Sequence, residues 1–227
     1  RTIAGTGTQA SHMAGGPALN TGLNSPWDLA LDGDRLLVAM AGNHQIWSLD
    51  LKGGTIGPVS GTGRENITDG PHKSADFSQP SGLSINAGKV YVADSEVSAI
   101  REVDLDPAGK VRTLVGKGLF DFGDKDGTGD AALLQHCIGL GWHNGVLYVA
   151  DSYNHKIKTV DPKTRAVKTF LGDGRKGYED GLKPRFHEPN GLSGWGDKLF
   201  IADTNNHAIR VCDLKTGSVS TLPVEMK

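Results

Sequence analysis

The segment "YVADSYNHKIKTVD", Tyr148–Asp161, recurs along the chain and decides the fold. Related segments are "FIADTNNHAIRVCD" ending at Asp213, "YVADSEVSAIREVD" ending at Asp104 and, with more differences, "LVAMAGNHQIWSLD" ending at Asp50. Successive copies are 54, 57 and 52 residues apart, measured at one aligned position that holds Met40, Asp94, Asp151 and Asp203. Repetition at this spacing is typical of a protein built from similar structural units.

Each copy has the pattern of short strands. Apolar residues alternate with polar ones over short stretches that Gly, Asn, Asp and Pro separate, which indicates strands and turns. In the third copy, "IGLGWHNG", "VLYVADS", "KIKTVDP" and "AVKTFLG" predict four successive strands. Four antiparallel strands form one blade of a β-propeller, whose faces neighbouring blades must cover. The sequence therefore predicts an all-β propeller region over 1–227 with blades at about 24–63, 77–118, 134–174 and 186–224.

The first residues resemble the last strand of a blade. "RTIAGTG", residues 1–7, matches "VRTLVGKG" and "VKTFLGDG", so we expect it to be the outer strand of a preceding blade. The last copy already has its own fourth strand, "SVSTLPV", so this extra strand has no place in a ring of four. We therefore expect four complete four-stranded blades within a ring of about six, and a chain that is a portion of a longer protein.

The segments between blades also recur. "TDGPHKSADFSQPSGL", "KDGTGDAALLQHCIGL" and "EDGLKPRFHEPNGL" each have an Asp-Gly pair, which predicts a tight turn. A bulky anchor residue follows, namely Phe77, Leu134 or Phe186. A glycine then precedes the first strand's leucine, at Gly82, Gly139 and Gly191. We expect these glycines where the innermost strands crowd together, because a Cβ there would meet the neighbouring blade.

Composition limits the classes of partner. The 227 residues include 24 basic and 26 acidic side chains, so the net charge of −2 does not indicate a nucleic-acid-binding surface. No apolar run approaches the roughly 20 residues needed to cross a bilayer, which argues against membrane insertion. Cys137 and Cys212 form no CxxC motif and stand where the other copies carry small or apolar residues or proline, so we predict buried thiols.

The turn within each copy resembles the NHL repeat, a family named for an Asn-His-Leu triplet. "YNHKI", "NNHAI" and "GNHQI" carry this resemblance, whereas the second copy lacks the Asn-His pair and the first has Met40 in place of the acid. "NSPWD", "DFSQPSGLS" and "FGDKDG" are similar to the NHL-repeat proteins that carry a thioredoxin-like domain, of the suppressor-of-quenching and NHL-repeat-containing protein 2 type. The resemblance covers essentially the whole chain. It implies a propeller associated with a redox centre that lies outside this segment.

Histidines and aspartates at repeated positions are predicted to be structural. Three histidines occupy equivalent turns of different blades: His44, His155 and His207. They cannot converge to the 2.0–2.1 Å that zinc requires, so we expect each ring to pack on, and hydrogen-bond to, the turn between the second and third strands. Three acids end the second strands: Asp94, Asp151 and Asp203. We expect them to accept backbone N–H groups of the following turn.

One acidic loop superficially resembles a calcium site. "FDFGDKDGTGD" contains Asp121, Asp124, Asp126 and Asp130. Calcium takes six to eight oxygen ligands, and the EF-hand loop closes with a Glu that this loop lacks. Asp126-Gly127 also aligns with the ordinary Asp-Gly pairs at 69–70 and 180–181. We therefore predict no metal here and keep calcium as the weaker alternative.

Residues that precede the innermost strands are the candidate binding site. These are Ser25, Gln79, His136 and Glu188. The entry ends of innermost strands converge at the mouth of the central channel, where a small molecule or metal would bind. Some NHL-type propellers are lyases that hold a metal with channel histidines. Here only His136 is a histidine at this repeat position, and His187 lies one residue before the equivalent position in the last copy.

The sequence thus favours a non-catalytic scaffold without a cofactor. Its variable loops would bind a protein partner or other domains of its own polypeptide, since a rigid ring orders loops before binding. The alternative is a metal-dependent lyase or hydrolase-like propeller with its site at the channel mouth. Self-association through open blade edges is a further possibility, because uncovered flanks attract a second copy.

Overall fold

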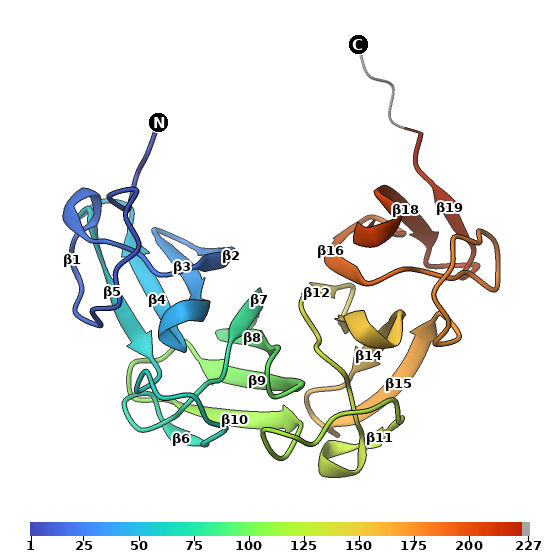
Figure 1. The fold of residues 1–227 in the computed structure, drawn as a ribbon, viewed down its shortest axis with the longest axis horizontal. Helices are drawn as coiled ribbons and strands as arrows, with labels where there is room; N and C mark the ends of the chain where they lie inside the picture. Colours follow the sequence, from blue (N-terminus) through green and yellow to red (C-terminus); the bar gives the residue numbers. More distant parts are fainter. Residues whose placement is uncertain (224–227) are drawn as a thin grey trace. The chain divides into compact units, whose positions relative to one another are not determined.

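Each repeat folds into one antiparallel sheet whose four main strands lie side by side in chain order (Figure 1). The computed structural model describes residues 1–223, in which the only helices are five short 3-10 segments. Two units are formed, Arg1–Asp121 and Phe122–Lys227, called here the first and second unit. Each unit holds two of the four sheets. The predicted all-β fold with four propeller blades is confirmed, and the ring of about six blades stays a prediction.

The first unit contains the first and second sheets. Successive apolar residues of the first sheet face opposite cores, with Leu37 and Ala39 in one and Val38 and Met40 in the other, so this sheet has two apolar faces to bury. The first sheet has β2 (Pro26–Asp32), β3 (Arg35–Met40), β4 (Gln45–Asp50) and β5 (Thr55–Ser60). The second has β7 (Pro80–Asn86), β8 (Lys89–Asp94), β9 (Ala99–Asp104) and β10 (Lys110–Val115).

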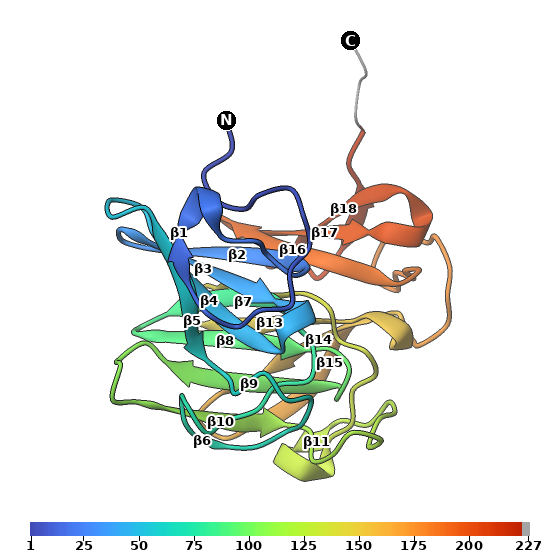
Figure 2. The same cartoon turned by 60° about the vertical axis from the view of Figure 1, so that its left-hand side comes forward.

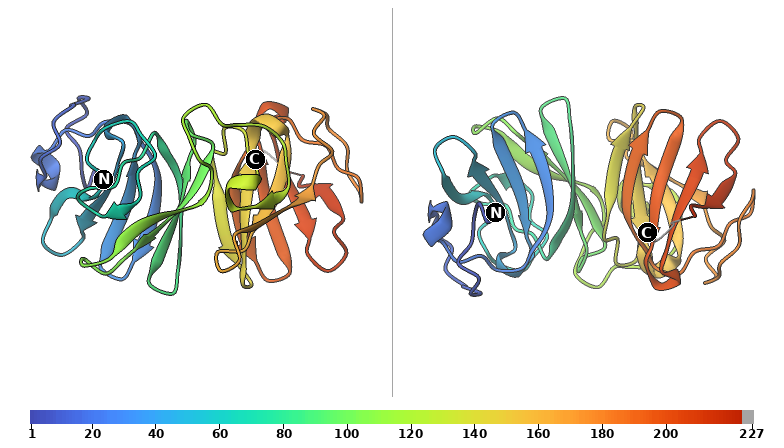
Figure 3. Two further views of the ribbon diagram at one scale, coloured as in Figure 1. Left: turned by 90° about the horizontal axis from the view of Figure 1, so that it is seen from below. Right: turned by 90° about the horizontal axis from the view of Figure 1, so that it is seen from above.

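The second unit contains the third and fourth sheets, which lie face to face (yellow and orange in Figure 3). The third sheet has β12 (Leu140–His143), β13 (Val146–Asp151), β14 (Lys156–Val160) and β15 (Ala166–Leu171). The fourth has β16 (Pro189–Trp195), β17 (Lys198–Asp203), β18 (Ala208–Asp213) and β19 (Val219–Thr221). The predicted end of the last blade, residue 224, lies outside the described residues.

The glycines of the Asp-Gly pairs at 69–70 and 126–127 begin short strands, and the chain reverses just after each pair, between the bridged residues Thr68 and Asp76 and between Lys125 and Leu133. Two-residue strands β1 (Gly16–Pro17), β6 (Gly70–Pro71) and β11 (Gly127–Thr128) add a fifth member to three of the sheets. In the fourth sheet Gly181 makes a single bridge to Val219. The glycine pairs with the fourth strand because the preceding aspartate is hydrogen-bonded to that strand, as Asp69 is to Thr113.

Residues 1–7 form no strand, which corrects the prediction of an outer strand there. A strand needs a partner for its backbone groups, and the described chain holds no third strand of a preceding blade. The N-terminal segment instead crosses the free face of the first sheet (dark blue in Figure 2). Ala4, Ala18 and Leu23 pack there against a cluster that includes Trp47, and Gly5 N donates to Ala18 O at 2.9 Å.

The predicted anchors are central to the cores. Phe77, Leu134 and Phe186 are fully buried. Phe77 joins apolar residues of the first and second sheets, and Phe186 joins those of the third and fourth. Burying a side chain of this kind contributes about 1.5–3 kcal/mol, so the anchors help to hold each pair of sheets together.

Glycine permits a close approach of β12 and β16 in the second unit. A Cβ added to Gly139 would lie 1.9 Å from Asn190 O, so the predicted crowding is confirmed there. At Gly191, the equivalent position, an added Cβ would meet only Ala202 Cβ, at 3.5 Å. The prediction is wrong for Gly191 because no following sheet covers that face within the described residues.

Candidate functional site

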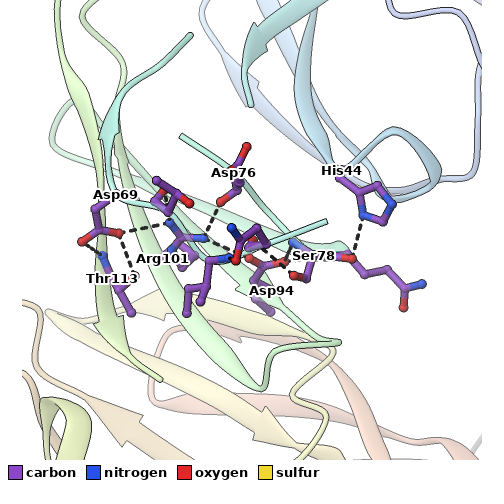
Figure 4. Close-up of polar contacts among 12 residues, drawn as sticks. His44, Asp69, Asp76, Ser78, Asp94, Arg101 and Thr113 are labelled. Atoms are coloured by element: carbon purple, nitrogen blue, oxygen red, sulfur yellow. Dashed lines mark hydrogen bonds and ion pairs between the residues drawn. The ribbon is translucent and has the colours of Figure 1, made fainter. Parts of the chain in front are cut away.

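A fully buried arginine organises the polar interior of the second sheet (Figure 4). Arg101 Nη1 lies 3.1 Å from Asp94 Oδ2 and donates to Asp76 O at 2.8 Å. Its Nη2 lies 3.1 Å from Asp69 Oδ1 and donates to Thr68 O at 3.0 Å. The guanidinium therefore connects the second and third strands to the segment that precedes the blade.

The fourth sheet repeats this arrangement with Arg210, which is also fully buried. Arg210 Nη1 lies 2.7 Å from Asp203 Oδ2, and Nη2 lies 2.6 Å from Asp180 Oδ1. The guanidinium carbon is also 5.0 Å from the centre of the Tyr178 ring and 5.4 Å from that of Phe186. Charge-assisted hydrogen bonds and ring contacts together compensate for the loss of water around this cation.

The third sheet has a lysine at the same position. Lys158 Nζ lies 2.8 Å from Asp124 Oδ1 and 3.3 Å from Asp126 Oδ1. It lies farther, at 3.5 Å, from Asp151 Oδ2. Burial raises the pKa of Asp151 to about 6, despite hydrogen bonds from Asn154 and from the backbone and the charge of Lys158. A lysine ammonium is a compact point charge, so it pairs with three carboxylates less effectively than the forked guanidinium of an arginine does.

The acids at the ends of the second strands receive backbone hydrogen bonds, but not from the following turn as predicted. Asp94 Oδ1 accepts the N–H groups of Ser78 and Gln79, both at 2.8 Å. These donors precede the first strand of the same sheet, because Asp94 stands opposite Pro80 in the register of β7 and β8. Asp151 and Asp203 accept the equivalent N–H groups, of Gln135 at 2.7 Å and of His187 at 2.8 Å.

The first sheet replaces the buried ions with apolar residues. Met40 and Trp47 occupy the positions of the acid and the cation, and both are fully buried. Met40 Sδ lies 3.3 Å from Asn24 N, so it takes the place of the carboxylate that accepts this backbone N–H in the other sheets. Sequence reasoning missed the cations, although one signal was present. An acid is followed seven residues later by Arg or Lys in three copies, and Met40 is followed by Trp47 in the remaining one.

The repeated histidines adopt a left-handed backbone. Their φ values lie between 52° and 54°, and each backbone N–H closes a 3-10 turn: η2 (Ala41–Asn43), η4 (Ser152–Asn154) or η5 (Thr204–Asn206). The ring of His44, however, reaches the next sheet, where Nδ1 lies 2.7 Å from Ser78 O (Figure 4). The backbone N–H of each histidine therefore makes the predicted contact with the turn that contains it. The ring of His44 instead links two blades of the first unit.

The second unit carries two groups of contacting side chains near the starts of its innermost strands, His136 with Tyr153 and His155 with His187, Glu188 and Asn205, and together they are called here the histidine surface. The His155 and His187 rings are 5.6 Å apart, edge to face, and His155 Nδ1 accepts the Glu188 N–H at 3.2 Å. The Glu188 carboxylate in turn accepts Asn205 Nδ2 at 2.8 Å.

An exposed aromatic ring completes the histidine surface. Tyr153 stacks on His136 with ring centres 4.5 Å apart, and 48% of Tyr153 is exposed. Of the predicted channel-mouth residues, His136 and Glu188 thus belong to the histidine surface. Ser25 and Gln79 belong to the first unit, where their carbonyl oxygens accept the N–H groups of Ala41 and Ser95, both at 3.0 Å.

We expect His155 to contribute a loss of stability to the second unit as the pH drops below about 6.5. Asp151 opposes this loss, because its pKa, raised to about 6, favours the folded state in acid. Burial, and then the nearby His187, lowers the pKa of His155. The folded state therefore holds this proton less tightly than the unfolded chain, and acid favours unfolding between the folded pKa and the ordinary value of 6.5. Protonation of Nδ1 would also remove the acceptor of the Glu188 N–H. Urea unfolding at about pH 7.5 and about pH 5.5 measures the effect.

Two asparagine variants test this pH dependence, since asparagine tolerates the left-handed backbone and does not titrate. His155→Asn should reduce the loss of stability in acid. His207→Asn changes the same repeat position in the next sheet and should leave the loss unchanged. An equal loss in His155→Asn and in the unmodified chain would contradict the assignment.

The acidic loop is paired with cations. Lys117 Nζ lies 3.3 Å from Asp121, and Arg165 Nη2 lies 2.5 Å from Asp130. The carboxylates of Asp124 and Asp126 hold Lys158, as described above. Within residues 1–223, no group of three or more His, Cys, Asp or Glu side chains is placed to hold a metal ion. The weaker alternative of a calcium site therefore gains no geometric support.

Both cysteines are buried thiols, as predicted. Cys137 and Cys212 are both thiols and are fully buried. Burial, and next the charge of Asp213, raises the pKa of Cys212 to about 11. A thiol with a raised pKa is a poor nucleophile at neutral pH, so Cys212 is suited to packing.

Each terminal sheet exposes apolar side chains on one flank. Leu29 and Leu31 of β2 are 55% and 64% exposed, and Leu222 beyond β19 is 40% exposed. These are the residues that the predicted self-association would cover. Separately, none of the described helices is long and apolar enough to span a membrane.

Comparison with protein families and curated proteins identifies similar sequences. The NHL repeat family model matches residues 23–48. The chain is 42% identical over 244 residues to protein SUPPRESSOR OF QUENCHING 1, chloroplastic, of Arabidopsis thaliana, and the match covers 100% of the chain and 23% of that protein. It is 42% identical over 261 residues to human NHL repeat-containing protein 2, with 98% of the chain and 36% of that protein covered. The chain thus spans well under half the length of these relatives.

Solved structures share the fold at low sequence identity. A protein of unknown function from Bacteroides thetaiotaomicron is 15% identical with a TM-score of 0.53, covering 97% of this chain and 63% of that one. An auxiliary nutrient binding protein from Bacteroides ovatus is 14% identical, with the same TM-score and coverage. At this level of identity the likeness concerns the fold alone.

Proposed function

Because this chain belongs to the NHL-repeat β-propellers, we propose that it is a non-catalytic scaffold whose histidine surface binds a protein partner or another domain of its own polypeptide. The observation that carries this proposal is the exposed Tyr153 ring, stacked on His136 beside charged and amide side chains. Tyrosine offers a large apolar area with a polar end at low entropic cost, which is why it is enriched in protein interfaces.

The hydrogen bonds of the histidine surface order its turns. His155 Nδ1 accepts the Glu188 N–H, and Glu188 Oε2 accepts a hydrogen bond from Asn205 Nδ2. These contacts connect the turn after β13 to the start of β16 and to the turn after β17. Ordered turns lower the entropy lost when a partner binds.

The partner that the resemblance implies is a thioredoxin-like domain of the parent polypeptide. The propeller would then position or regulate a redox centre that lies outside this segment. The family resemblance supports this step, and the chemistry of the histidine surface is compatible with it. An amphipathic Tyr153 and a carboxylate at Glu188 suit a partner surface with an apolar centre and a basic or amide rim.

A direct binding experiment tests the scaffold. The chain is titrated with a purified thioredoxin-like domain from the parent polypeptide, and the affinity is measured by calorimetry. We expect Tyr153→Ser to weaken binding about tenfold or more, as loss of a central interface aromatic does. The matched control is Trp195→Ser, because Trp195 is also an exposed aromatic of the second unit, 73% exposed, but lies at the far end of β16 from Glu188.

Three results would overturn the proposal. The first is equal weakening by Tyr153→Ser and Trp195→Ser, and the second is no binding of the domain to the unmodified chain. The third is stoichiometric metal in the purified chain that His136→Ala removes, which would favour the metal-dependent alternative. Metal content is measured by mass spectrometry of the native protein.

A further inference from the structure

A pocket of about 430 Å³ opens between the first and second sheets of the first unit. Its floor consists of four buried apolar residues: Leu37, Ile46, Val90 and Val103. Its rim includes Val59, which is 43% exposed, and the turn at 106–109. Sites for small molecules have volumes of about 300–1,000 Å³ and predominantly apolar linings, so both size and lining suit a ligand.

The pocket exists because the first sheet lacks two aromatic rings that the third sheet carries, one of them at a position that is aromatic in every other copy. Leu37 stands where the other copies have Tyr91, Tyr148 and Phe200. By strand register, Val59 occupies the position that Phe170 holds in the third sheet. There the rings of Tyr148 and Phe170 pack together, with centres 5.4 Å apart.

The matching place in the second unit is correspondingly smaller. A pocket of about 220 Å³ is lined by Phe170, Leu182 and Pro184, among others, but by neither Tyr148 nor Ile157. The aromatic pair of the third sheet therefore closes off the floor that remains open in the first sheet. Protein interiors are closely packed, and an apolar volume left open lacks the dispersion contacts that a ring would supply.

The charges around the rim balance. Arg35 pairs with Asp32, and Asp104 pairs with Lys89. Lys73 and Asp106 remain, and within residues 1–223 neither has an ion-pair partner. Charges of opposite sign at one rim favour neither an anion nor a cation over an uncharged molecule.

A histidine braces one end of the pocket. His72 Nδ1 lies 3.2 Å from Ser60 Oγ, and Nε2 lies 3.0 Å from Asp106 O. The first contact is to the first sheet and the second is to the turn after β9. The two walls of the pocket are thereby tied together, and a preformed site loses less entropy when a ligand binds.

We propose that this pocket binds a small uncharged aromatic molecule of one or two rings. Its rings would occupy the volume that Tyr148 and Phe170 fill in the third sheet. The site lies in the first unit and does not depend on the histidine surface. Burial of apolar ring area against Leu37, Ile46 and Val103 would supply the affinity, at roughly 25 cal/mol per Å² of surface removed from water.

The test uses indole, an uncharged molecule of two fused aromatic rings, as the probe. Methyl-labelled chain is titrated with the probe and followed by NMR. We expect saturable shifts of the Leu37, Ile46 and Val59 methyl signals, and none for Leu29 and Leu31 on the open flank of the same unit. Shifts confined to Leu29 and Leu31 would overturn the proposal, because they would indicate adsorption to the flank.

Filling the pocket provides the second arm. Leu37→Tyr with Val59→Phe restores the aromatic pair of the third sheet and should weaken probe binding about tenfold or more. Val59→Phe alone changes only a part-exposed residue of the rim, so this variant should fold even if the double variant does not. It should also weaken probe binding. The control Leu29→Ser with Leu31→Ser should bind as the unmodified chain does. Unchanged binding in a folded Val59→Phe variant would contradict the proposal.

Discussion

Replacing Arg101 with methionine is expected to lower the free energy of unfolding of the first unit by about 3–5 kcal/mol. The substitution keeps much of the side-chain volume but leaves the fully buried Asp94 carboxylate without its cation. It also removes the donors to Asp76 O and Thr68 O. A buried charge that loses its partner keeps the cost of its lost hydration, which makes this the most damaging single change that we predict. Urea unfolding followed by circular dichroism measures the loss.

The control is an ion pair at the surface of the same unit. Lys52 pairs with Asp34 at 2.5 Å, but the two side chains are 76% and 63% exposed. Lys52→Met should therefore change the free energy of unfolding by no more than about 1 kcal/mol. A loss of similar size in both variants would show that burial of Arg101 is not what matters.

A double replacement tests the physical cause. Asp94→Met with Arg101→Trp copies the apolar pair Met40 and Trp47 of the first sheet. Because this variant leaves no unpaired buried carboxylate, it should lose less stability than Arg101→Met alone, as when other buried ion pairs are replaced by apolar residues. If the double variant were the less stable of the two, the charge left behind would not be the source of the cost.

Substituting Gly139 with alanine is expected to lower the free energy of unfolding of the second unit by about 1–3 kcal/mol or more, since 1–3 kcal/mol is the usual cost of overpacking. The new Cβ would lie 1.9 Å from Asn190 O and 2.9 Å from Asn190 C, both backbone atoms of β16. Backbone atoms cannot rotate away as the end of a side chain can, so β12 and β16 would have to separate. Their separation would loosen the third and fourth sheets, and the urea midpoint measures it.

The chain supplies its own control for this prediction. Gly191 occupies the same repeat position, but its added Cβ would meet only Ala202 Cβ, at 3.5 Å. Gly191→Ala should therefore be tolerated, with a change within about 0.5 kcal/mol. Similar losses in the two variants would mean that the conformational freedom of glycine, rather than the close approach of β12 and β16, is required at this position.

The alternation of apolar residues was sufficient to predict the sheets, because local pattern and strand geometry share the period of two. It was not sufficient for residues whose role depends on a neighbour. "RTIAGTG" has the pattern of a strand, yet residues 1–7 form none, since strand formation requires a partner and not only a pattern. The Asp-Gly pairs predicted a reversal of the chain, but not the hydrogen bond between Asp69 and Thr113, which is 44 residues away.

In the candidate site, too, the local pattern predicted the backbone but not the contacts between segments. The repeat spacing indicated that His44 and His155 hold equivalent positions, and their backbone is indeed equivalent. Their ring partners could not be predicted, because Ser78 O and the Glu188 N–H belong to the next sheet. The buried cations were missed for a related reason: an arginine in an alternating strand looks exposed unless its acceptors, which come from distant segments, are known.

The sequence by itself determined the number of sheets, their strand order and the buried anchors, because these follow from periodicity and side-chain size within one repeat. Only the tertiary structure decided which polar groups are satisfied inside, where glycine is required and where a pocket remains. The physical reason is that hydrogen bonds, ion pairs and close packing act between atoms a few ångströms apart. Those atoms come from segments that adjoin in space only after neighbouring repeats have packed together.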